Sequence, residues 1–377
     1  MYKIAHVQVM PKLSGVQNFS LNVLKSLDGC EKYLICSSSE FVSDQQREFF
    51  EKSFLDNDIK IIWMKHLKRS IGVHDLYACR ELWELFKEYK FDIVHTNSTK
   101  PGILARVVAK VAGIRTVVHT VHGVSFHAQE KKIKRFFYFL LEAIALQFGN
   151  YNISVNKYYL KYYKFFFWKK SICIYNGADF SRMTTNLMKD LPPVMNKGVK
   201  NVLFVGRLDI PKNPLVAIKA FSLLIRRGFN VKFHIVGDGE LRDVCEKLVK
   251  YLNIEDHVIF HGWVDTPYSF YSECDVFFSP SIYEAFGFTF TEAAYFSKPI
   301  VSSTVEGIPE IVKDKKMGFL CNPKNHVSMA DSLQKIISDN TLSKEMGEYG
   351  KEYVLSNFNL TICLEKYKEV YIELMKK

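Results

Sequence analysis

Short apolar runs rich in Val, Ile and Phe alternate along the chain with longer amphipathic segments of helical length. Such runs are typical of buried parallel strands, which are covered by helices on both faces. In the first half, strands are predicted near 2–9, 32–37, 59–64, 91–95, 115–121, 151–155 and 172–175. In the second half, they are predicted near 201–205, 231–236, 257–260, 275–279, 299–303 and 317–321.

This alternation predicts an α/β fold with two doubly wound parallel sheets. It stops between 176 and 200, where Asn-Gly, Ser, Thr and Pro-Pro give a linker composition. We therefore expect an N-terminal domain over 1–180, a linker over 181–200, a C-terminal domain over 201–358 and a helix over 359–377 that packs back on the N-terminal domain. Helix is expected over about 341–376 as a whole. Ligands of such sheets bind at the carboxyl ends of the strands.

The composition agrees with two globular domains. The chain has 377 residues, of which 48% are hydrophobic, enough for two cores. The longest apolar run, Phe136–Phe148, is shorter than the ~20 residues that a spanning helix needs. Because Tyr2–Val9 already has a strand pattern, no secretory signal is expected. The eight cysteines show no metal-binding spacing, which favours reduced thiols in a cytosol.

The net charge of +11 is unevenly distributed. Residues 1–190 carry the whole excess, and 101–175 hold 12 basic and 2 acidic residues. Aromatic side chains alternate with the cations over 131–138 and 158–170, as suits an anionic membrane surface. A helix with a buried aromatic stripe and a solvated basic face is the structural alternative, and nucleic acid is a weaker one. The candidate membrane and acceptor contacts are Lys131, Lys132, Lys134 and Arg135.

Two cations follow the strand predicted at 201–205. Gly206 permits close backbone approach, and Arg207 and Lys212 then lie before a helix expected near Pro214. A guanidinium fork and a lysine point charge suit a diphosphate, although two surface cations are the alternative. The turn at 237–240 lacks the third glycine of a dinucleotide fingerprint, so no NAD site is predicted there.

Two carboxylates eight residues apart form the most specific pattern, in 279–293. Glu284 ends a strand and its loop, and Glu292 lies in the next helix. Phe286-Gly287-Phe288 would begin that helix, so that its amides point towards a ligand. Spaced carboxylates accept pairs of hydroxyl hydrogen bonds, as ribose and a sugar offer. A helix-surface Glu292 and a glycosidase acid pair are the alternatives.

The first half offers weaker candidates. Gly15 lies in a small-residue turn before a helix from about Val16, where amides can face an anion. His122 is expected at the end of the strand 115–121, and His95 ends the strand 91–95 and faces the same way. No zinc motif accompanies these histidines. The D-x-D pattern Asp56-Asn57-Asp58 precedes a strand, and we interpret it as a turn.

Together these motifs resemble the family 4 retaining glycosyltransferases, which have two Rossmann-like domains in the GT-B fold. The resemblance covers almost the whole chain. It rests on Ser14-Gly15-Val16-Gln17, DIVHTNSTKPGILAR at 92–106, HTVHG at 119–123, IYNGAD at 174–179, VGRLDIPKN at 205–213, VGDGE at 236–240, the E-x7-E pair Glu284/Glu292 and PIVSSTVEGIPEIV at 299–312. The chain departs from the common pattern in having Ser14-Gly15 for Gly-Gly and Gln17 for Glu.

The resemblance implies a role for each candidate. Arg207 and Lys212 would bind the donor diphosphate, and Glu292 the ribose. Glu284 and the amides of 286–288 would hold the transferred sugar. Gly15 would line the diphosphate, His122 would contact the sugar near the reacting centre, and the loop with Val264 would flank the base. Such enzymes usually need no metal, and no cofactor is expected besides the nucleotide-sugar substrate.

The expected activity is the retaining transfer of a hexose or N-acetylhexosamine from a UDP-sugar. The acceptor would be a polyprenyl-diphosphate-linked glycan, in O-antigen, lipopolysaccharide or capsule biosynthesis. The enzyme would lie on the inner face of the cytoplasmic membrane as a peripheral protein, without nucleic acid. The alternatives are another enzyme of this fold, such as a nucleotide-sugar epimerase or a phosphorylase, and a non-catalytic membrane-surface binding protein.

Overall fold

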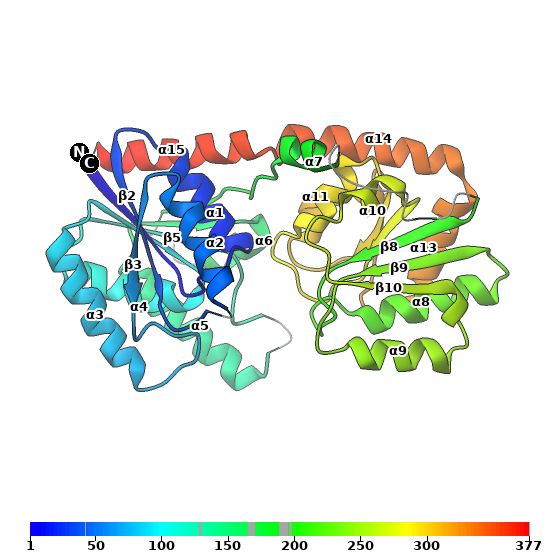
Figure 1. Ribbon diagram of the computed structural model, residues 1–377, viewed down its shortest axis with the longest axis horizontal. Helices are drawn as coiled ribbons and strands as arrows, with labels where there is room; N and C mark the ends of the chain where they lie inside the picture. Colours follow the sequence, from blue (N-terminus) through cyan, green and yellow to red (C-terminus); the bar gives the residue numbers. More distant parts are fainter. Residues whose placement is uncertain (42, 128–129, 165–169, 188–194, 196–197, 377) are drawn as a thin grey trace. The chain divides into compact units, whose positions relative to one another are not determined.

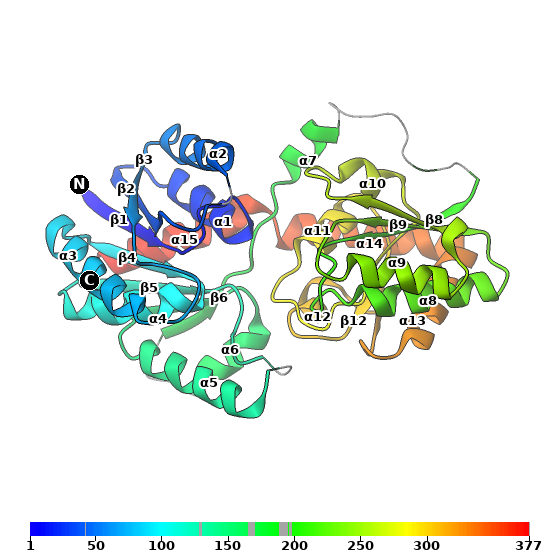
Figure 2. The ribbon, with the colours of Figure 1, turned by 60° about the horizontal axis from the view of Figure 1, so that its bottom comes forward.

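The computed structural model describes residues 1–41, 43–127, 130–164, 170–187, 195 and 198–376, and divides the chain into two compact units (Figure 1). Unit 1 comprises Met1–Asn176 and Cys363–Lys377. Unit 2 comprises Gly177–Ile362. Figure 2 shows that both chain ends lie in unit 1.

Unit 1 contains a parallel sheet of seven strands in the order β3-β2-β1-β4-β5-β6-β7. The strands are β1 Tyr2–Val7, β2 Cys30–Ser37, β3 Ile59–Met64, β4 Ile93–Asn97, β5 Thr116–Val121, β6 Tyr151–Ser154 and β7 Lys170–Cys173. The strand order reverses between β1 and β4, which is where doubly wound sheets bind ligands.

Helices cover both faces of this sheet, because successive strand residues point to opposite sides. On one face Ile4 and Ile93 pack against α1 Gly15–Lys25, α2 Asp44–Leu55 and α15 Leu360–Met375. On the other, Ala5 and Val94 pack against α3 His74–Tyr89 and α4 Thr99–Val111. Two further helices, α5 Lys132–Leu146 and α6 Lys157–Lys164, follow (Figure 2).

Unit 2 contains a parallel sheet of six strands in the order β10-β9-β8-β11-β12-β13. The strands are β8 Lys200–Val205, β9 Val231–Val236, β10 Val258–Gly262, β11 Val276–Ser279, β12 Ile300–Ser303 and β13 Gly318–Cys321. The order reverses between β8 and β11, as it does between β1 and β4 in unit 1. All thirteen predicted strands are therefore present, with ends shifted by up to two residues, and the predicted fold class is confirmed.

The helices of unit 2 also lie on both faces of its sheet (Figure 1). A buried cluster joins Phe204 and Phe233 to α8 Pro214–Arg226, α9 Arg242–Tyr251 and α13 His326–Ser338. The remaining helices are α7 Phe180–Leu187, α10 Tyr268–Glu273, α11 Phe288–Tyr295, α12 Ile308–Ile311 and α14 Asn340–Asn357, with a 3-10 turn at Glu255–His257.

Two segments differ from the sequence expectation. Part of the stretch expected as a linker, 181–200, is helix α7 of unit 2, because Phe180 stacks on Tyr295 and Thr184 hydrogen-bonds to the Tyr295 hydroxyl. The helix expected over 341–376 is interrupted: α14 ends at Asn357 and α15 begins at Leu360. The Ala178 amide donates there to the Phe358 carbonyl, and the Leu360 amide donates to the Ala178 carbonyl, so these backbone groups bond outside a continuous helix.

Within the described part of the chain, no helix combines the length and the apolar character that a membrane crossing requires. All eight cysteines are free thiols, five of them buried.

Candidate active site

The loop after β8 carries the two predicted cations of unit 2. Arg207 is two-thirds exposed, and its Nη2 lies 2.8 Å from Asp209 Oδ2. Asp209 is buried, and its other oxygen accepts from the Lys212 amide at 3.1 Å, so one carboxylate shapes the whole turn. The loop after β9 packs closely against this turn at Gly237, which has a positive φ. A Cβ atom on residue 237 would lie 1.9 Å from the Gly206 carbonyl oxygen, so only glycine fits.

Glu284 lies on the loop after β11, beside the switch in strand order. Its carboxylate accepts a hydrogen bond from Lys212 Nζ, and both side chains are largely buried. The Glu284 amide donates to Glu306 Oε2 at 3.2 Å, and its carbonyl accepts from Gly307 at 3.2 Å. The structure thus brings Lys212 and Glu284, 72 residues apart, together across the β8/β11 junction.

Helix α11 begins directly after this loop. Gly287 has φ +79° and precedes the helix, and a Cβ there would meet the Phe290 ring at 2.6 Å. Phe286 is buried and packs edge-on against Phe288 and Phe358. The predicted helix start at 286–288 is therefore correct to within one residue, and it lies beside Glu284.

Glu292 lies one turn into α11, and it is not an ordinary surface residue. Its Oε2 accepts a hydrogen bond from the Tyr271 hydroxyl at 2.8 Å. Burial raises the pKa of Glu292, while the Tyr271 hydrogen bond and the charge of Lys212 oppose that rise. A carboxylate with one satisfied oxygen retains acceptor capacity for a diol.

Val264 belongs to the loop after β10. Trp263 beside it is 63% exposed, and its indole Nε1 donates to Asp265 at 2.8 Å. The indole ring is thus oriented and largely exposed, which suits stacking against a flat ligand.

His122 of unit 1 follows β5 and is held by neighbours from other elements. Its Nε2 lies 3.1 Å from Asn97 Oδ1, at the end of β4. The edge of its ring packs against Phe19 of α1, with centroids 4.8 Å apart. Burial lowers the pKa of His122 to about 3, so the ring is neutral at physiological pH.

The small-residue turn of unit 1 matches its prediction closely. Ser14 is the N-cap residue of α1, and Gly15 is the first residue of that helix and is exposed. The Ser14 hydroxyl donates to the side chain of Gln17. Asp56-Asn57-Asp58 forms a turn between α2 and β3, as expected. Among the described residues, no group of three or more His, Cys, Asp or Glu side chains is arranged to hold a metal ion.

Two other histidines, His95 and His119, lie on the strands beside His122 and point to opposite faces of the sheet. His95 faces the same side of the sheet as His122, as expected, since the rings of both residues pack against Phe19; it is fully buried there, between Tyr371 and Thr120. His119 points to the opposite face of the sheet, where it bonds Thr96 and lies over Gly102. Alternation along the strand separates the side chains of residues 119 and 122 in this way.

The predicted basic and aromatic surface is partly described, since 165–169 lie outside the described residues. Lys131, Lys132 and Lys134 are exposed, and Arg135 is half-buried. The apolar stripe of α5 is exposed too, rather than buried as in the structural alternative. The stripe consists of Ile133, Phe136, Phe137, Leu140 and Ile144, with exposures of 44–86%.

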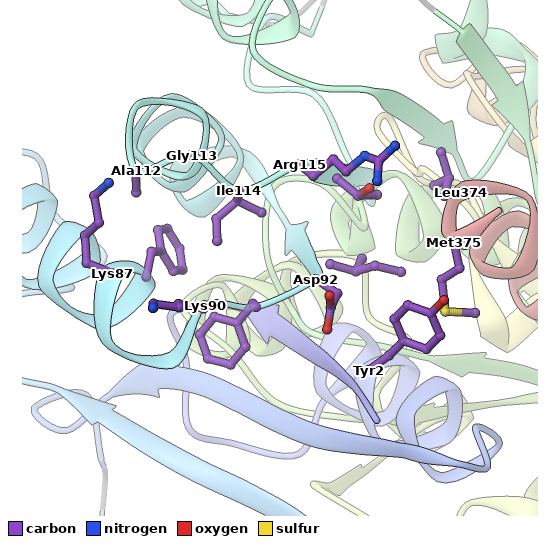
Figure 3. A pocket seen from close by; sticks show the side chains of 14 residues that line it. Tyr2, Lys87, Lys90, Asp92, Ala112, Gly113, Ile114, Arg115, Leu374 and Met375 are labelled. Atoms are coloured by element: carbon purple, nitrogen blue, oxygen red, sulfur yellow. The ribbon is translucent and has the colours of Figure 1, made fainter. Parts of the chain in front are cut away.

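A pocket of about 480 Å³ lies elsewhere in unit 1 (Figure 3). Tyr2, Asp92 and Ile93 line it, at the starts of β1 and β4. Lys87, Lys90 and Arg115 contribute charge around it. It therefore lies at the amino ends of the strands, and none of the predicted site residues lines it.

Known families match both halves of the chain. The profile described as Glycosyltransferase Family 4 matches residues 15–182, and that of Glycosyl transferases group 1 matches 192–353. An Escherichia coli UDP-Gal:alpha-D-GlcNAc-diphosphoundecaprenol alpha-1,3-galactosyltransferase is 30% identical, over 99% of this chain and 97% of that protein. This chain belongs to glycosyltransferase family 4.

Other relatives of this family 4 glycosyltransferase agree. The capsular polysaccharide biosynthesis glycosyltransferase CapM of Staphylococcus aureus is 24% identical, over 86% of this chain and 88% of CapM. Among solved structures, Anabaena HepE in complex with UDP gives a TM-score of 0.80 at 17% identity, covering 99% and 100% of the chains. A Rickettsia africae glycosyltransferase gives 0.78 at 22% identity, covering 100% and 99%. These likenesses confirm the GT-B fold.

Sequence reasoning missed the residues that hold the predicted ones. Asp209 shapes the Arg207–Lys212 turn, Tyr271 holds Glu292, Glu306 holds the Glu284 loop and Asn97 holds His122. Asp209 lies inside the quoted motif, and a short acid between two cations was a usable signal. Glu306 likewise lies inside the quoted motif at 299–312, whereas Tyr271 carries no local signal.

Proposed function

We propose that this glycosyltransferase moves a hexose or N-acetylhexosamine from a UDP-sugar to a polyprenyl-diphosphate-linked glycan, with retention of configuration and without a metal ion. The observation that carries the donor half is the cluster of Arg207, Asp209, Lys212 and Glu284 at the β8/β11 junction. The Escherichia coli relative, whose name gives a UDP-sugar donor and a diphosphoundecaprenol acceptor, supports the substrate class.

The donor diphosphate would bind to Arg207 and Lys212, in place of their present carboxylate partners where these compete. Lys212 forms an ion pair with Glu284, and a phosphate oxygen of the donor would replace that carboxylate. Arg207, held by Asp209, would form paired hydrogen bonds to the other phosphate. Two cations then stabilise the charge that grows on the leaving UDP, the task that a divalent metal performs in other transferases.

The freed Glu284 would accept hydroxyl hydrogen bonds from the transferred sugar, beside the start of α11. Glu292 would hold the two ribose hydroxyls, and Trp263 and Val264 would flank the base. Gly15 would line the diphosphate, and His122 would contact the sugar.

In the reaction itself, the bond between the anomeric carbon and the phosphate oxygen breaks. The acceptor oxygen bonds to the same face of that carbon, and the acceptor's proton passes to the leaving phosphate. The protein contributes positioning and charge.

The test is a panel of UDP- and GDP-sugars with an N-acetylglucosaminyl-diphosphoundecaprenol acceptor, with and without EDTA. We expect UDP release and a lipid-linked product from one donor, equally fast in EDTA, and an NMR coupling constant that shows the retained anomer. An inverted product or inhibition by EDTA would contradict the respective part of the proposal. Absence of UDP or GDP binding by calorimetry would refute the donor assignment altogether and favour the membrane-binding alternative.

We also propose that α5 binds the anionic inner surface of the cytoplasmic membrane. Its exposed apolar stripe alternates with Lys132, Lys134 and Arg135, and together they would insert rings between lipids while pairing with phosphates. A lipid-linked acceptor lies at the same surface, so binding there would concentrate the enzyme on its substrate.

Liposome sedimentation tests this surface. Phe136→Ser/Phe137→Ser and Lys132→Gln/Lys134→Gln should each lower binding to vesicles with anionic lipid, while turnover of a short, water-soluble acceptor stays unchanged. Lys247→Gln/Lys250→Gln on α9 is the matched control and should bind as the parent protein does. Equal binding to neutral vesicles, or no loss in either α5 variant, would reject the proposal.

A further inference from the structure

A chain of hydrogen-bonded polar side chains crosses the interior of unit 1 and ends at His122. It links helix α15 to strands β1, β4 and β5, and every member besides His122 is fully buried. The members are His6, Asn97, Tyr371, His95, Thr120 and Tyr367. Buried polar groups cost free energy unless they are paired, so these pairings constrain one another.

The links near His122 run through Asn97 and His6. His122 Nε2 lies 3.1 Å from Asn97 Oδ1, and Asn97 Nδ2 lies 3.5 Å from His6 Nδ1. His6 Nε2 then lies 2.8 Å from the Tyr371 hydroxyl. The chain therefore leaves the sheet edge and reaches helix α15 in three links.

The links beyond Tyr371 return to the sheet. The Tyr371 hydroxyl lies 2.5 Å from His95 Nδ1, and His95 Nε2 lies 2.8 Å from Thr120 Oγ1. The Thr120 hydroxyl is 3.3 Å from that of Tyr367. Tyr371 is thus the only link described between the two halves of this chain of hydrogen bonds.

All three imidazoles of the chain are neutral at physiological pH. Burial lowers the pKa of His6 and His122 to about 3, and that of His95 well below its usual value. A neutral imidazole has one N–H donor and one lone-pair acceptor. When one ring nitrogen donates, the other must accept, so the direction of each bond fixes the direction of the next.

The contacts of Asn97 show which direction the chain of hydrogen bonds has. Its Nδ2 also lies 3.4 Å from Ser20 Oγ, and the Ser20 hydroxyl donates to Gln8 Oε1 at 3.3 Å. Ser20 Oγ is therefore an acceptor towards Asn97, whose amide nitrogen donates to Ser20 and His6. Asn97 Oδ1 is left to accept from His122, which must carry its proton on Nε2.

We propose that Tyr371 is a positioning residue for glycosyl transfer: by relaying one hydrogen-bond direction through His6 and Asn97, it fixes His122 in the Nε2–H form. The Nδ1 lone pair of His122 is then presented to a hydroxyl of the transferred sugar, which must donate. Tyr371 accepts from His6 Nε2–H and donates to His95, as a phenol can do and a phenylalanine cannot. The sugar contact rests on the proposed function, whereas the tautomer does not.

The tautomer is measured by two-bond 1H–15N correlation spectra of the full chain labelled with 15N-histidine, with His122 assigned by the loss of its signals in His122→Gln. We expect one Nε2–H form in the parent protein and a mixture of both forms in Tyr371→Phe. Tyr33→Phe is the matched control, because it also removes a hydroxyl from a buried ring of unit 1, one bonded to Glu31. A single unchanged tautomer in Tyr371→Phe, or Nδ1–H in the parent protein, would overturn the relay.

The kinetic arm uses Thr120 as a second way to interrupt the chain. Tyr371→Phe and Thr120→Val should lower kcat about five- to tenfold, the value of one hydrogen bond, with the KM for the donor unchanged. Thr120→Ser keeps the hydroxyl and should restore kcat, and thermal melting checks that all variants fold. A mixed tautomer with unchanged kcat would refute the contact between His122 and the sugar while leaving the donor site of unit 2 intact.

Discussion

The carboxyl edges of the two sheets have the same switch in strand order but carry different side chains. In unit 2, the loops after β8 and β11 hold two ion pairs, Arg207–Asp209 and Lys212–Glu284. In unit 1, the end of β4 holds Asn97 and the loop after β5 holds His122, which is neutral at physiological pH. The same switch in strand order thus has two ion pairs beside it in unit 2 and the neutral pair Asn97–His122 beside it in unit 1.

This difference indicates which part of a substrate each edge is suited to bind. Charge is useful where a diphosphate must be bound and released, because cations stabilise the departing phosphate. Neutral hydrogen bonds orient uncharged hydroxyls without attracting competing anions. Unit 1 does contain the ion pair Arg106–Glu142, at 2.7 Å, but it is buried between α4 and α5. Its role is therefore structural.

The largest expected effect comes from removing a cation at the charged edge. Lys212→Ala should lower kcat about 10³-fold, because the growing charge of the leaving phosphate loses its partner. The measurement is UDP release at saturating donor. Lys219→Ala, an exposed lysine on α8, is the control and should retain full activity. A loss of less than tenfold in Lys212→Ala would contradict the charged-edge assignment.

Removing the buried charge of Glu142 in unit 1 should lower the stability of the protein and leave kcat unchanged. Glu142→Gln leaves the Arg106 guanidinium buried without a counter-charge, so the free energy of unfolding should fall by about 3 kcal/mol. Urea unfolding followed by circular dichroism measures it. Glu84→Gln breaks the exposed pair with Arg80 and should change stability by less than about 0.5 kcal/mol. Equal losses in the two variants would remove the distinction between buried and exposed pairs.

The third effect separates binding from chemistry within unit 2. Glu292→Gln should raise the KM for the donor about tenfold with little change in kcat, since an amide accepts fewer hydroxyl hydrogen bonds than a carboxylate. Initial rates over a range of donor concentrations measure both constants. Tyr353→Phe, which removes a hydroxyl bonded to the Glu310 carbonyl, is the matched control. A fall in kcat alone would assign Glu292 to the reacting sugar.

The smallest effect is on pH dependence. Because burial raises the pKa of Glu292, its carboxylate takes up a proton at a higher pH than an exposed glutamate does. Donor affinity should therefore fall as the pH is lowered, beginning above the usual glutamate pKa of about 4.3. Calorimetric titration with UDP from about pH 7 to about pH 5 measures the decline. Glu292→Gln should show a flatter profile, and parallel profiles would assign the titration elsewhere.

The sequence was sufficient to predict the strands and the candidate residues of the charged edge. Val/Ile-rich runs bounded by turns identify buried strands, and the E-x7-E spacing placed Glu284 and Glu292 on a loop and a helix. Local pattern suffices for such features, because they depend on residues within one turn or strand.

The partners of those residues could not be predicted in the same way. The contact between Lys212 and Glu284 depends on β8 and β11 lying side by side, which strand order alone decides. The hydrogen bond between His95 and Tyr371 depends on helix α15, which the pattern placed on the N-terminal domain without a register. The exposed face of α5 agrees with the predicted basic and aromatic surface, although an apolar stripe taken alone normally indicates burial.

The place of α15 in the chain affects how the protein forms during synthesis. Tyr367 and Tyr371 complete the core of unit 1, yet the ribosome adds them only after all of unit 2 has been made. The first 176 residues are therefore made without the helix that covers His6, His95 and part of one apolar sheet face, while a later-made unit completes its own core. A nascent chain in that state offers chaperones a binding surface, and a premature stop before Tyr367 would release a chain in which the earlier-made unit is the damaged one.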